Sequence, residues 1–470
     1  MFTISTTERV STCQGISRRS LLQVGGLALG GLSLSGLLAG RAVAAQSRSY
    51  VRNKSVVFLF LQGGPSHIEL FDPKMTAPVE IRSITGEVKT KLPGVTFGGT
   101  FPKLAAMANR LSVVRSFASG NTNHQDLLKV ASGGNAMKAP MGAVYSRLAG
   151  TNHPRSGMPT NVFVPPEAAQ PGLKLGSNFE TKALPQLKSS GSLGAAFAAF
   201  DPSSGGELKE NLQLRLPRGQ FEDRRKLLSQ LDTFRRRVDA SGTVGRMNTY
   251  QQQAYELILR GVAGAFDLAK EDARTLDRYD STKVFRQEEF QRYGDMKRCS
   301  NLLGRQMLMA RRLCEAGCGF VTVSDSGWDM HSNGNSPKFL GGMYPLGSQV
   351  DFAVSAFLED VRERGLSDDI LLVISGEMGR TPKINKNGGR DHWGNLTPLL
   401  LAGGGLKMGQ VIGASDRTAA KPATKTYTPA HLLSTVMHTL FDPGQLRITS
   451  GLPRDVAKLA SDGEPITELF

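Results

Sequence analysis

Acidic and histidine side chains gather in three stretches of the C-terminal half, at or beside the ends of short apolar runs. These stretches are residues 319–331, 370–380 and 389–393, and the last leads into the apolar segment 397–402. Short β-rich runs with glycine, acid and histidine at their carboxyl ends are typical of a parallel sheet whose carboxyl edge carries a site. We therefore predict an α/β sandwich with a mostly parallel central sheet.

The first strand is predicted at residues 54–62, where an apolar run suits a central position in the sheet. It leads into the loop 63–69, whose two glycines allow a ligand to approach the backbone closely. A polar loop at 119–126 follows a short strand predicted at 111–115. We expect both loops at the carboxyl edge of the sheet.

The remaining elements are predicted from apolar spacing and composition. Apolar residues at 350, 353, 357 and 361 have helical spacing and predict a crossover helix between two strands. A closing helix is predicted at 429–441. Residues 150–205 are rich in Pro, Gly and Ser and are expected to form surface loops. The charge-rich segment at about 205–300 is predicted to be a helical insertion or cap, within one domain that spans residues 46–470.

Residues 1–45 have the pattern of a twin-arginine signal peptide. Arg18 and Arg19 precede a Gly/Leu/Ala-rich run, and Ala42-Val-Ala44 offers small residues for a signal peptidase. We expect the twin-arginine translocase to export the protein to the periplasm or cell envelope, and the mature chain to begin near Ala45 or Gln46. An uncleaved membrane anchor is the alternative for this segment.

The formal net charge of +16 and the pI of about 9.8 indicate affinity for anions, or alternatively only a basic solvated surface. No zinc-finger spacing or RNA-binding signature is present, so nucleic acid is not an expected partner. No Walker loop or Gly-x-Gly-x-x-Gly is present, which argues against nucleotide binding. The expected partner is an anionic ester or polymer, and the oligomeric state is left open.

Five residues are candidate ligands of one divalent metal, because carboxylates and imidazoles brought to one edge of a sheet suit such an ion. Asp325, Asp329 and His331 lie within seven residues after a predicted strand. The Asp-x-His spacing places residues 329 and 331 on one side of an extended segment. Asp391 and His392 precede another apolar segment. The metal could be zinc, calcium or magnesium, and any of these residues could instead be an ordinary turn residue.

The candidate catalytic residues are Ser66, Thr122, His124, Glu377 and Arg380. Glu377 lies between glycines after a buried strand and could act as a ligand or base, or simply as a carboxylate at a helix start. Arg380 could hold an anionic ester oxygen by a bidentate contact. Ser66 lacks the second glycine of the Gly-x-Ser-x-Gly nucleophile elbow, so the sequence does not predict an α/β-hydrolase.

Seven short motifs are spread over nearly all of the mature chain: Gly63-Gly-Pro-Ser-His67, Phe71-Asp-Pro-Lys74, Asn123-His124, and residues 310–317, 328–331, 376–382 and 389–393. Together they resemble an exported bacterial family called domain of unknown function 1501. That family is placed in the alkaline phosphatase superfamily, with sulfatases and phosphodiesterases.

The resemblance implies an alkaline-phosphatase-like fold and an exported, metal-dependent hydrolase of phosphate or sulfate esters. One metal site would use Asp325 or Asp329 with His331 and His392, and a nucleophile would fall near residues 122–124.

Two departures from the superfamily pattern imply one metal rather than two. Gln62-Gly63 stands where a metal-binding Asp is expected, and Glu377 stands where an Asp-His pair is expected. The alternative to an enzyme is a catalytically inactive exported protein that binds an anionic envelope polymer or a protein partner.

Overall fold

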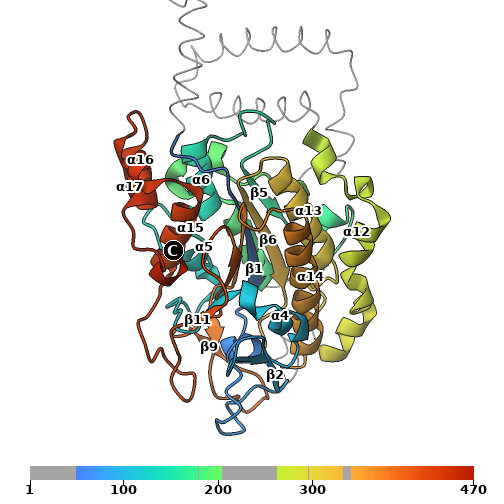
Figure 1. Ribbon diagram of the computed structural model, residues 1–470. Helices are drawn as coiled ribbons and strands as arrows, with labels where there is room; N and C mark the ends of the chain where they lie inside the picture. Colours follow the sequence, from blue (N-terminus) through green and yellow to red (C-terminus); the bar gives the residue numbers. More distant parts are fainter. Residues whose placement is uncertain (1–48, 178, 204–261, 295, 332–339) are drawn as a thin grey trace, which may run out of the picture. The chain divides into compact units, whose positions relative to one another are not determined.

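A seven-stranded sheet runs through the computed structural model (Figure 1). Its strands, in spatial order, are β11 (Gln410–Ile412), β4 (Ser112–Val114), β10 (Leu400–Gly403), β7 (Ile370–Ser375), β1 (Ser55–Gln62), β6 (Phe320–Ser326) and β5 (Asn161–Val164). The neighbours β7, β1, β6 and β5 are parallel, whereas β10 runs antiparallel to β7 and β4. The predicted α/β class with a mostly parallel central sheet is confirmed.

The structure describes residues 49–177, 179–203, 262–294, 296–331 and 340–470. The chain divides into residues 1–50 and 51–470, and the fold concerns the second unit. The predicted signal peptide at 1–45 lies outside the described residues. Within those residues, no helix combines the length and the apolar character needed to cross a bilayer.

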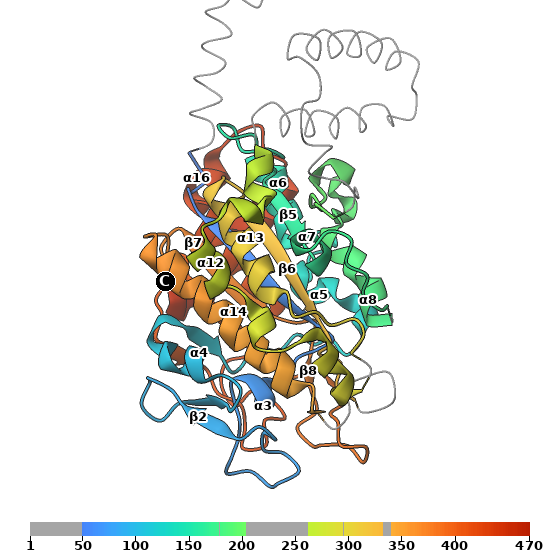
Figure 2. The same cartoon turned by 90° about the vertical axis from the view of Figure 1, so that its right-hand side faces the viewer.

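Helices cover both faces of the sheet. The helices α13 (Leu303–Glu315) and α14 (Met343–Glu363) pack together on one face, and in Figure 2 they lie in front of the sheet. The other face is covered by α6 (Met141–Ala149) and α15 (Pro429–Leu440). The apolar positions 350, 353, 357 and 361 of the crossover helix are all buried, and the closing helix ends one residue before the predicted position.

The other helices in the described part of the chain are short. Six lie in the connections between strands: α3 (His67–Leu70), α4 (Pro102–Ala106), α5 (Leu128–Ala131), α7 (Pro166–Ala169), α8 (Phe179–Ala183) and α12 (Ala273–Arg278). Two follow the last strand: α16 (Pro443–Ile448) and α17 (Arg454–Ser461). Two small antiparallel pairs complete the described structure: β2 (Glu87–Lys89) with β3 (Thr96–Gly98), and β8 (Gly379–Arg380) with β9 (His392–Trp393).

The prediction of surface loops at 150–205 is wrong in part, because this segment contains the edge strand β5 as well as α7 and α8. The run Asn161-Val-Phe-Val164 is fully buried, but four residues among prolines and glycines are a weak signal. Of the predicted helical insertion, residues 204–261 lie outside the described part of the chain. Residues 262–294 form α12 and short 3-10 turns, several of which pack against α13.

The register of the parallel strands brings their carboxyl ends to one level. Leu61 in β1 pairs with Asp325 in β6, and Phe60 pairs with Ser375 in β7. The loops that follow these three strands therefore meet at one edge of the sheet. The β8–β9 pair, which places Arg380 opposite His392, belongs to the same edge and lies towards the bottom of Figure 1.

Candidate metal centre

Four side chains from distant parts of the chain converge at this edge: His124, Asp329, His331 and His392. A ligand atom from each lies within 4.8 Å of the others. The Nε2 atoms of His124, His331 and His392 lie 3.4, 3.0 and 3.5 Å from Asp329 Oδ1, and those of His331 and His392 are 2.7 Å apart. Three imidazole nitrogens and one carboxylate oxygen directed at one point could hold a divalent metal.

The local structure fixes each of these side chains. His124 opens a 3-10 turn that is capped by the Asn123 side chain, which accepts a hydrogen bond from the backbone of Gln125. Asp329 and His331 follow β6. Gly389 packs directly on the backbone of His331, where a Cβ atom would lie only 2.2 Å from the carbonyl carbon. A glycine at this position therefore lets the β8–β9 connection approach the cluster closely.

The second ring nitrogen of every histidine in the cluster donates a hydrogen bond to a protein oxygen. Partners of this kind are typical of metal-binding histidines, because they set the orientation and the tautomer of the ring. The acceptors are Glu377 Oε1, 2.8 Å from His124 Nδ1; Asp391 Oδ1, 3.0 Å from His331 Nδ1; and the Thr122 carbonyl oxygen, 2.7 Å from His392 Nδ1. The Nε2 atom of each neutral ring is thereby left to bind a metal.

Arg380 is buried beside the cluster and is bonded to protein groups only. Its Nη2 atom lies 2.5 Å from Asp329 Oδ1 and also donates to the Gly63 carbonyl. Its Nε and Nη1 atoms donate to the carbonyl oxygens of Gly64 and Arg390, at 2.7 and 3.1 Å. Since its side chain is only 1% exposed, the guanidinium stabilises the ionised carboxylate of Asp329 and is not presented to a ligand.

These contacts determine the charge of the metal-free site. Burial would lower the pKa of His124, but hydrogen bonds to Asp329 and Glu377 outweigh it and raise the pKa to about 9. Burial would raise the pKa of Asp329, but Arg380 and the three imidazoles hold it well below its usual range. Burial lowers the pKa of His392. At neutral pH, Asp329 is therefore ionised and His124 is protonated until a metal displaces its proton.

Two buried oxygens at the site have no hydrogen-bond partner among the described residues. They are Asp329 Oδ2 and Glu377 Oε2, and both side chains have an exposed fraction of zero. A buried carboxylate oxygen without a partner costs free energy, so such atoms usually indicate an ion or water that completes the site. Together with the chemistry of the four donors, this shows that the residues present fit a divalent metal.

The structure places the remaining predicted residues around this cluster or away from it. Glu377, Asp391 and Thr122 orient the histidines. Asp325 is not in the cluster, because its carboxylate accepts hydrogen bonds from Trp328 and Gln349. Ser66 caps α3, with its hydroxyl 3.4 Å from the backbone nitrogen of Glu69.

Sequence reasoning missed two supporting contacts. Asn385 donates hydrogen bonds to Asp391 and to the carbonyl oxygen of His331, both at 3.0 Å. Arg390, which precedes Asp391, forms a buried ion pair with Glu69 at 2.8 Å. No local signal distinguishes Asn385 from a turn residue, because one of its two partners, the His331 carbonyl, is 54 positions away.

Comparisons with solved structures find distant likenesses, among them to the following three proteins. A sulfatase from Pseudoalteromonas sp. is 13% identical, with a TM-score of 0.35 over 91% of this chain and 75% of that one. A phosphonate monoester hydrolase from Silicibacter pomeroyi is 12% identical, with a TM-score of 0.32 over 88% and 76%. The lipoteichoic acid synthase LtaP from Listeria monocytogenes is 10% identical, with a TM-score of 0.28 over 89% and 79%.

No curated protein matches the chain. One family model does match, over residues 53–470, and its description is protein of unknown function (DUF1501). The match includes every residue of the cluster and covers most of the chain. This chain therefore belongs to the DUF1501 family.

Proposed function

We propose that this protein is an exported, metal-dependent hydrolase of phosphate or sulfate esters that uses a single metal site. The metal would be held by His124, Asp329, His331 and His392. The observation that carries this proposal is the convergence of three Nε2 atoms on Asp329, with every second ring nitrogen already engaged.

The donor set favours zinc or a similar transition metal among the ions considered from the sequence. Imidazole nitrogens suit zinc, whereas calcium and magnesium prefer a shell made of oxygens. When bound, such a metal polarises an ester oxygen and lowers the pKa of water to about 7, which supplies a nucleophile at neutral pH.

The protein side chains have separate tasks in this proposal. Glu377 and Asp391 hold two imidazoles in the binding orientation, and Arg380 keeps Asp329 ionised. The side chains of His331 and His392 are 15% and 24% exposed, whereas those of His124 and Asp329 are 4% and 0% exposed. An ester would therefore approach from the side of His331 and His392, where the exposed residue Thr122 also lies.

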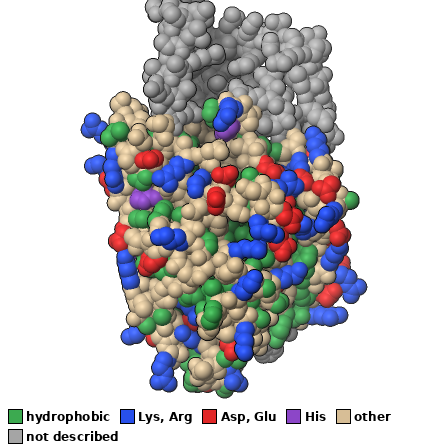
Figure 3. Space-filling model, in the orientation of Figure 1, with side chains coloured by type: hydrophobic (Ala, Val, Ile, Leu, Met, Phe, Trp, Pro, Cys, Tyr) green, Lys and Arg blue, Asp and Glu red, His purple; other side chains and the backbone are tan. Residues whose placement is uncertain are grey.

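The second candidate is an inactive exported protein that binds an anionic envelope polymer or a protein partner. The two arginines near the site favour only its first feature, the absence of ester hydrolysis. Arg380 and Arg390 are both buried and bonded to protein acceptors, so neither holds an anion at the site. On the face seen in Figure 3, Lys and Arg side chains are interspersed with acidic ones and form no single patch.

Metal analysis and substrate screening separate the two candidates. Protein purified without chelator is analysed for metal and assayed with aryl phosphates, phosphodiesters and aryl sulfates. The enzyme is supported by one metal per chain and ester hydrolysis that are both lost in His331→Ala. The matched control is His153→Ala, a partly exposed loop histidine outside the cluster. A bound metal with no hydrolysis of any ester would favour the binding protein, and no metal at all would refute the metal site.

Export by the twin-arginine translocase to the periplasm or cell envelope is part of the proposal. It is motivated by Arg18 and Arg19 ahead of the apolar run. Replacing both arginines with lysine should retain the protein in the cytoplasm on cell fractionation. Unchanged export would exclude this route.

A further inference from the structure

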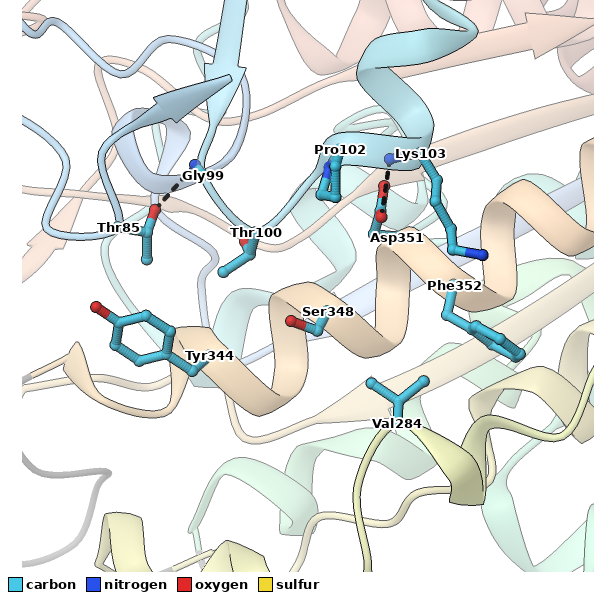
Figure 4. Close-up of a pocket in the computed structure, with 10 residues that line it drawn as sticks. All are labelled: Thr85, Gly99, Thr100, Pro102, Lys103, Val284, Tyr344, Ser348, Asp351 and Phe352. Carbon is cyan, nitrogen blue, oxygen red and sulfur yellow. Dashed lines mark hydrogen bonds between the residues drawn. The ribbon is translucent and has the colours of Figure 1, made fainter. Parts of the chain in front are cut away.

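A groove on the side of the molecule that carries α14 is lined by aromatic and hydroxyl side chains (Figure 4). It has a volume of about 330 Å³, within the range of pockets that bind small ligands, and none of the four cluster residues lines it. Its lining includes Tyr344, Ser348 and Phe352 from α14, and Thr85, Thr100 and Lys103 from the opposite wall.

The α14 side of the groove presents two aromatic rings with a hydroxyl between them. Tyr344, Ser348 and Phe352 are spaced four residues apart and so lie on one face of the helix. Residues 344 and 352 are about 12 Å apart along the axis, since an α-helix rises about 1.5 Å per residue. Tyr344 is 46% exposed, although it is a large aromatic residue.

The opposite wall supplies polar groups and is held rigidly to the helix. Both carboxylate oxygens of Asp351 on α14 accept backbone hydrogen bonds from the start of α4, at 3.0 Å from Lys103 and 2.7 Å from Leu104. The Lys103 ammonium lies 5.1 Å from the centre of the Phe352 ring. Thr100 is only 7% exposed, and its hydroxyl has no hydrogen-bond partner among the described residues.

We propose that this groove binds a carbohydrate, with one or two sugar units lying along α14 between Tyr344 and Phe352. A pyranose ring has an apolar C–H face that can pack on an aromatic ring and a rim of hydroxyls that exchange hydrogen bonds with Ser and Thr. A lipid chain would offer no polar partner to the Ser348 hydroxyl or the Lys103 ammonium, at a cost in free energy. Lys103 at the Phe352 end adds a charged donor, so a sugar with a sulfate, phosphate or carboxylate group there binds most tightly.

This inference does not depend on the metal site, and it is tested on protein stripped of metal. The full exported chain is treated with chelator and applied to an array of immobilised oligosaccharides, both neutral and sulfated or uronic. We expect retention of at least one oligosaccharide, with an anionic form bound more tightly than its neutral counterpart. Ser348→Trp should fill the groove and weaken binding at least tenfold, and Tyr344→Ala should weaken it as well.

Glu359→Trp is the matched control, because Glu359 is an exposed residue of α14 that does not line the groove. It should bind like the wild type. Lys103→Ala should remove only the preference for the anionic form. The proposal is overturned if the metal-free protein retains no oligosaccharide. It is also overturned if Ser348→Trp, like the control Glu359→Trp, binds oligosaccharides as tightly as the wild type. Because the protein is free of metal in this experiment, the result does not depend on whether the cluster binds a metal.

Discussion

Two buried groups of charged side chains in this protein are built on opposite principles. In the first, which we call the Asp329 cluster, one oxygen of Asp329 is close to three imidazoles and Arg380, while the other has no hydrogen-bond partner among the described residues. In the second, which we call the Asp360 cluster, Oδ2 of Asp360 accepts from Tyr279 and Arg311, each at 2.9 Å, and Oδ1 accepts from Arg364 at 2.8 Å.

The difference shows that buried charge alone does not indicate function. The Asp360 cluster joins α13, α14 and the segment 271–279, and both oxygens of its central carboxylate are satisfied by the protein. In the Asp329 cluster, three histidine Nε2 atoms face one point and each ring is oriented by a hydrogen bond at Nδ1. Asp329 Oδ2 has no hydrogen-bond partner among the described residues. We therefore expect substitutions in the Asp329 cluster to change metal binding and substitutions in the Asp360 cluster to change stability.

The largest expected effect on metal binding is that of Asp329→Asn, which keeps the shape of the side chain but removes its charge. Residues that only orient a metal ligand typically contribute 10–100-fold to metal affinity, and loss of this carboxylate should exceed about 100-fold. Competition with a chromophoric chelator measures the change. Wild-type affinity in this variant would show that the cluster is not a metal site.

The next effect concerns the Asp360 cluster. Arg311→Met leaves the buried carboxylate of Asp360 with one fewer positive partner, and should lower the free energy of unfolding by about 3–5 kcal/mol without changing metal content. Denaturant unfolding and metal analysis give the two readings. Arg305→Met on the same helix is the control and should be near neutral, because Arg305 is only partly buried. If Arg311→Met lost metal while its stability stayed unchanged, the Asp360 cluster would act on metal binding and the expectation would be wrong.

A smaller effect is expected for the carboxylates behind the histidines. Glu377→Gln should weaken metal binding about 10–100-fold, because it removes the charge of a fully buried partner of His124. Asp391→Asn should cost less, since the Asp391 side chain is 56% exposed and solvent screens its interaction with His331. Isothermal titration with zinc compares the two variants. Equal losses of zinc affinity in the two variants would mean that burial of the carboxylate does not determine how strongly it supports metal binding.

The smallest effect is a pH dependence outside both clusters. Burial raises the pKa of Asp351 from 3.8 to about 6, against its two backbone hydrogen bonds. The folded state then binds more protons than the unfolded state between these values, so this group makes the protein more stable as the pH falls. Between pH 7 and pH 5 the gain is about 1 kcal/mol.

Asp351→Asn should lack that gain when urea unfolding is compared at the two pH values. His67 acts in the opposite direction, because burial lowers its pKa from 6.5 to about 4 and the unfolded state takes up the proton. That contribution is common to both proteins and cancels in the difference between them. The same pH dependence in both proteins would show that Asp351 does not titrate in this range.

Much of the sheet and the approximate site could be predicted from the sequence, because both depend on local pattern. The apolar runs that end in acid or histidine are β6 and β7 with their following loops, and parallel pairing makes those ends meet. The choice between Asp325 and Asp329 could not be made, because it depends on where β6 ends. Asp325 still lies inside the strand, paired with Leu61, whereas Asp329 lies beyond it.

The roles of His124 and Arg380 could not be predicted from the sequence for a different reason. The sequence makes His124 a candidate catalytic residue, but its place in the ligand cluster depends on Glu377, which is 253 positions away. Arg380 has the chemistry to hold an anion, but three carbonyl oxygens and Asp329 occupy its guanidinium group. Side-chain chemistry can be read from sequence, whereas competition among partners depends on tertiary structure.

The central position of β1 also determines when this protein can fold. The strand is made early, but its two neighbours, β6 and β7, begin about 260 and 310 residues later in the chain. At a synthesis rate of about 5–20 residues per second, the apolar strand waits roughly 13–60 s for its partners. During that time it is a template for wrong pairing. The nascent chain is therefore expected to depend on a chaperone until residue 375 has left the ribosome.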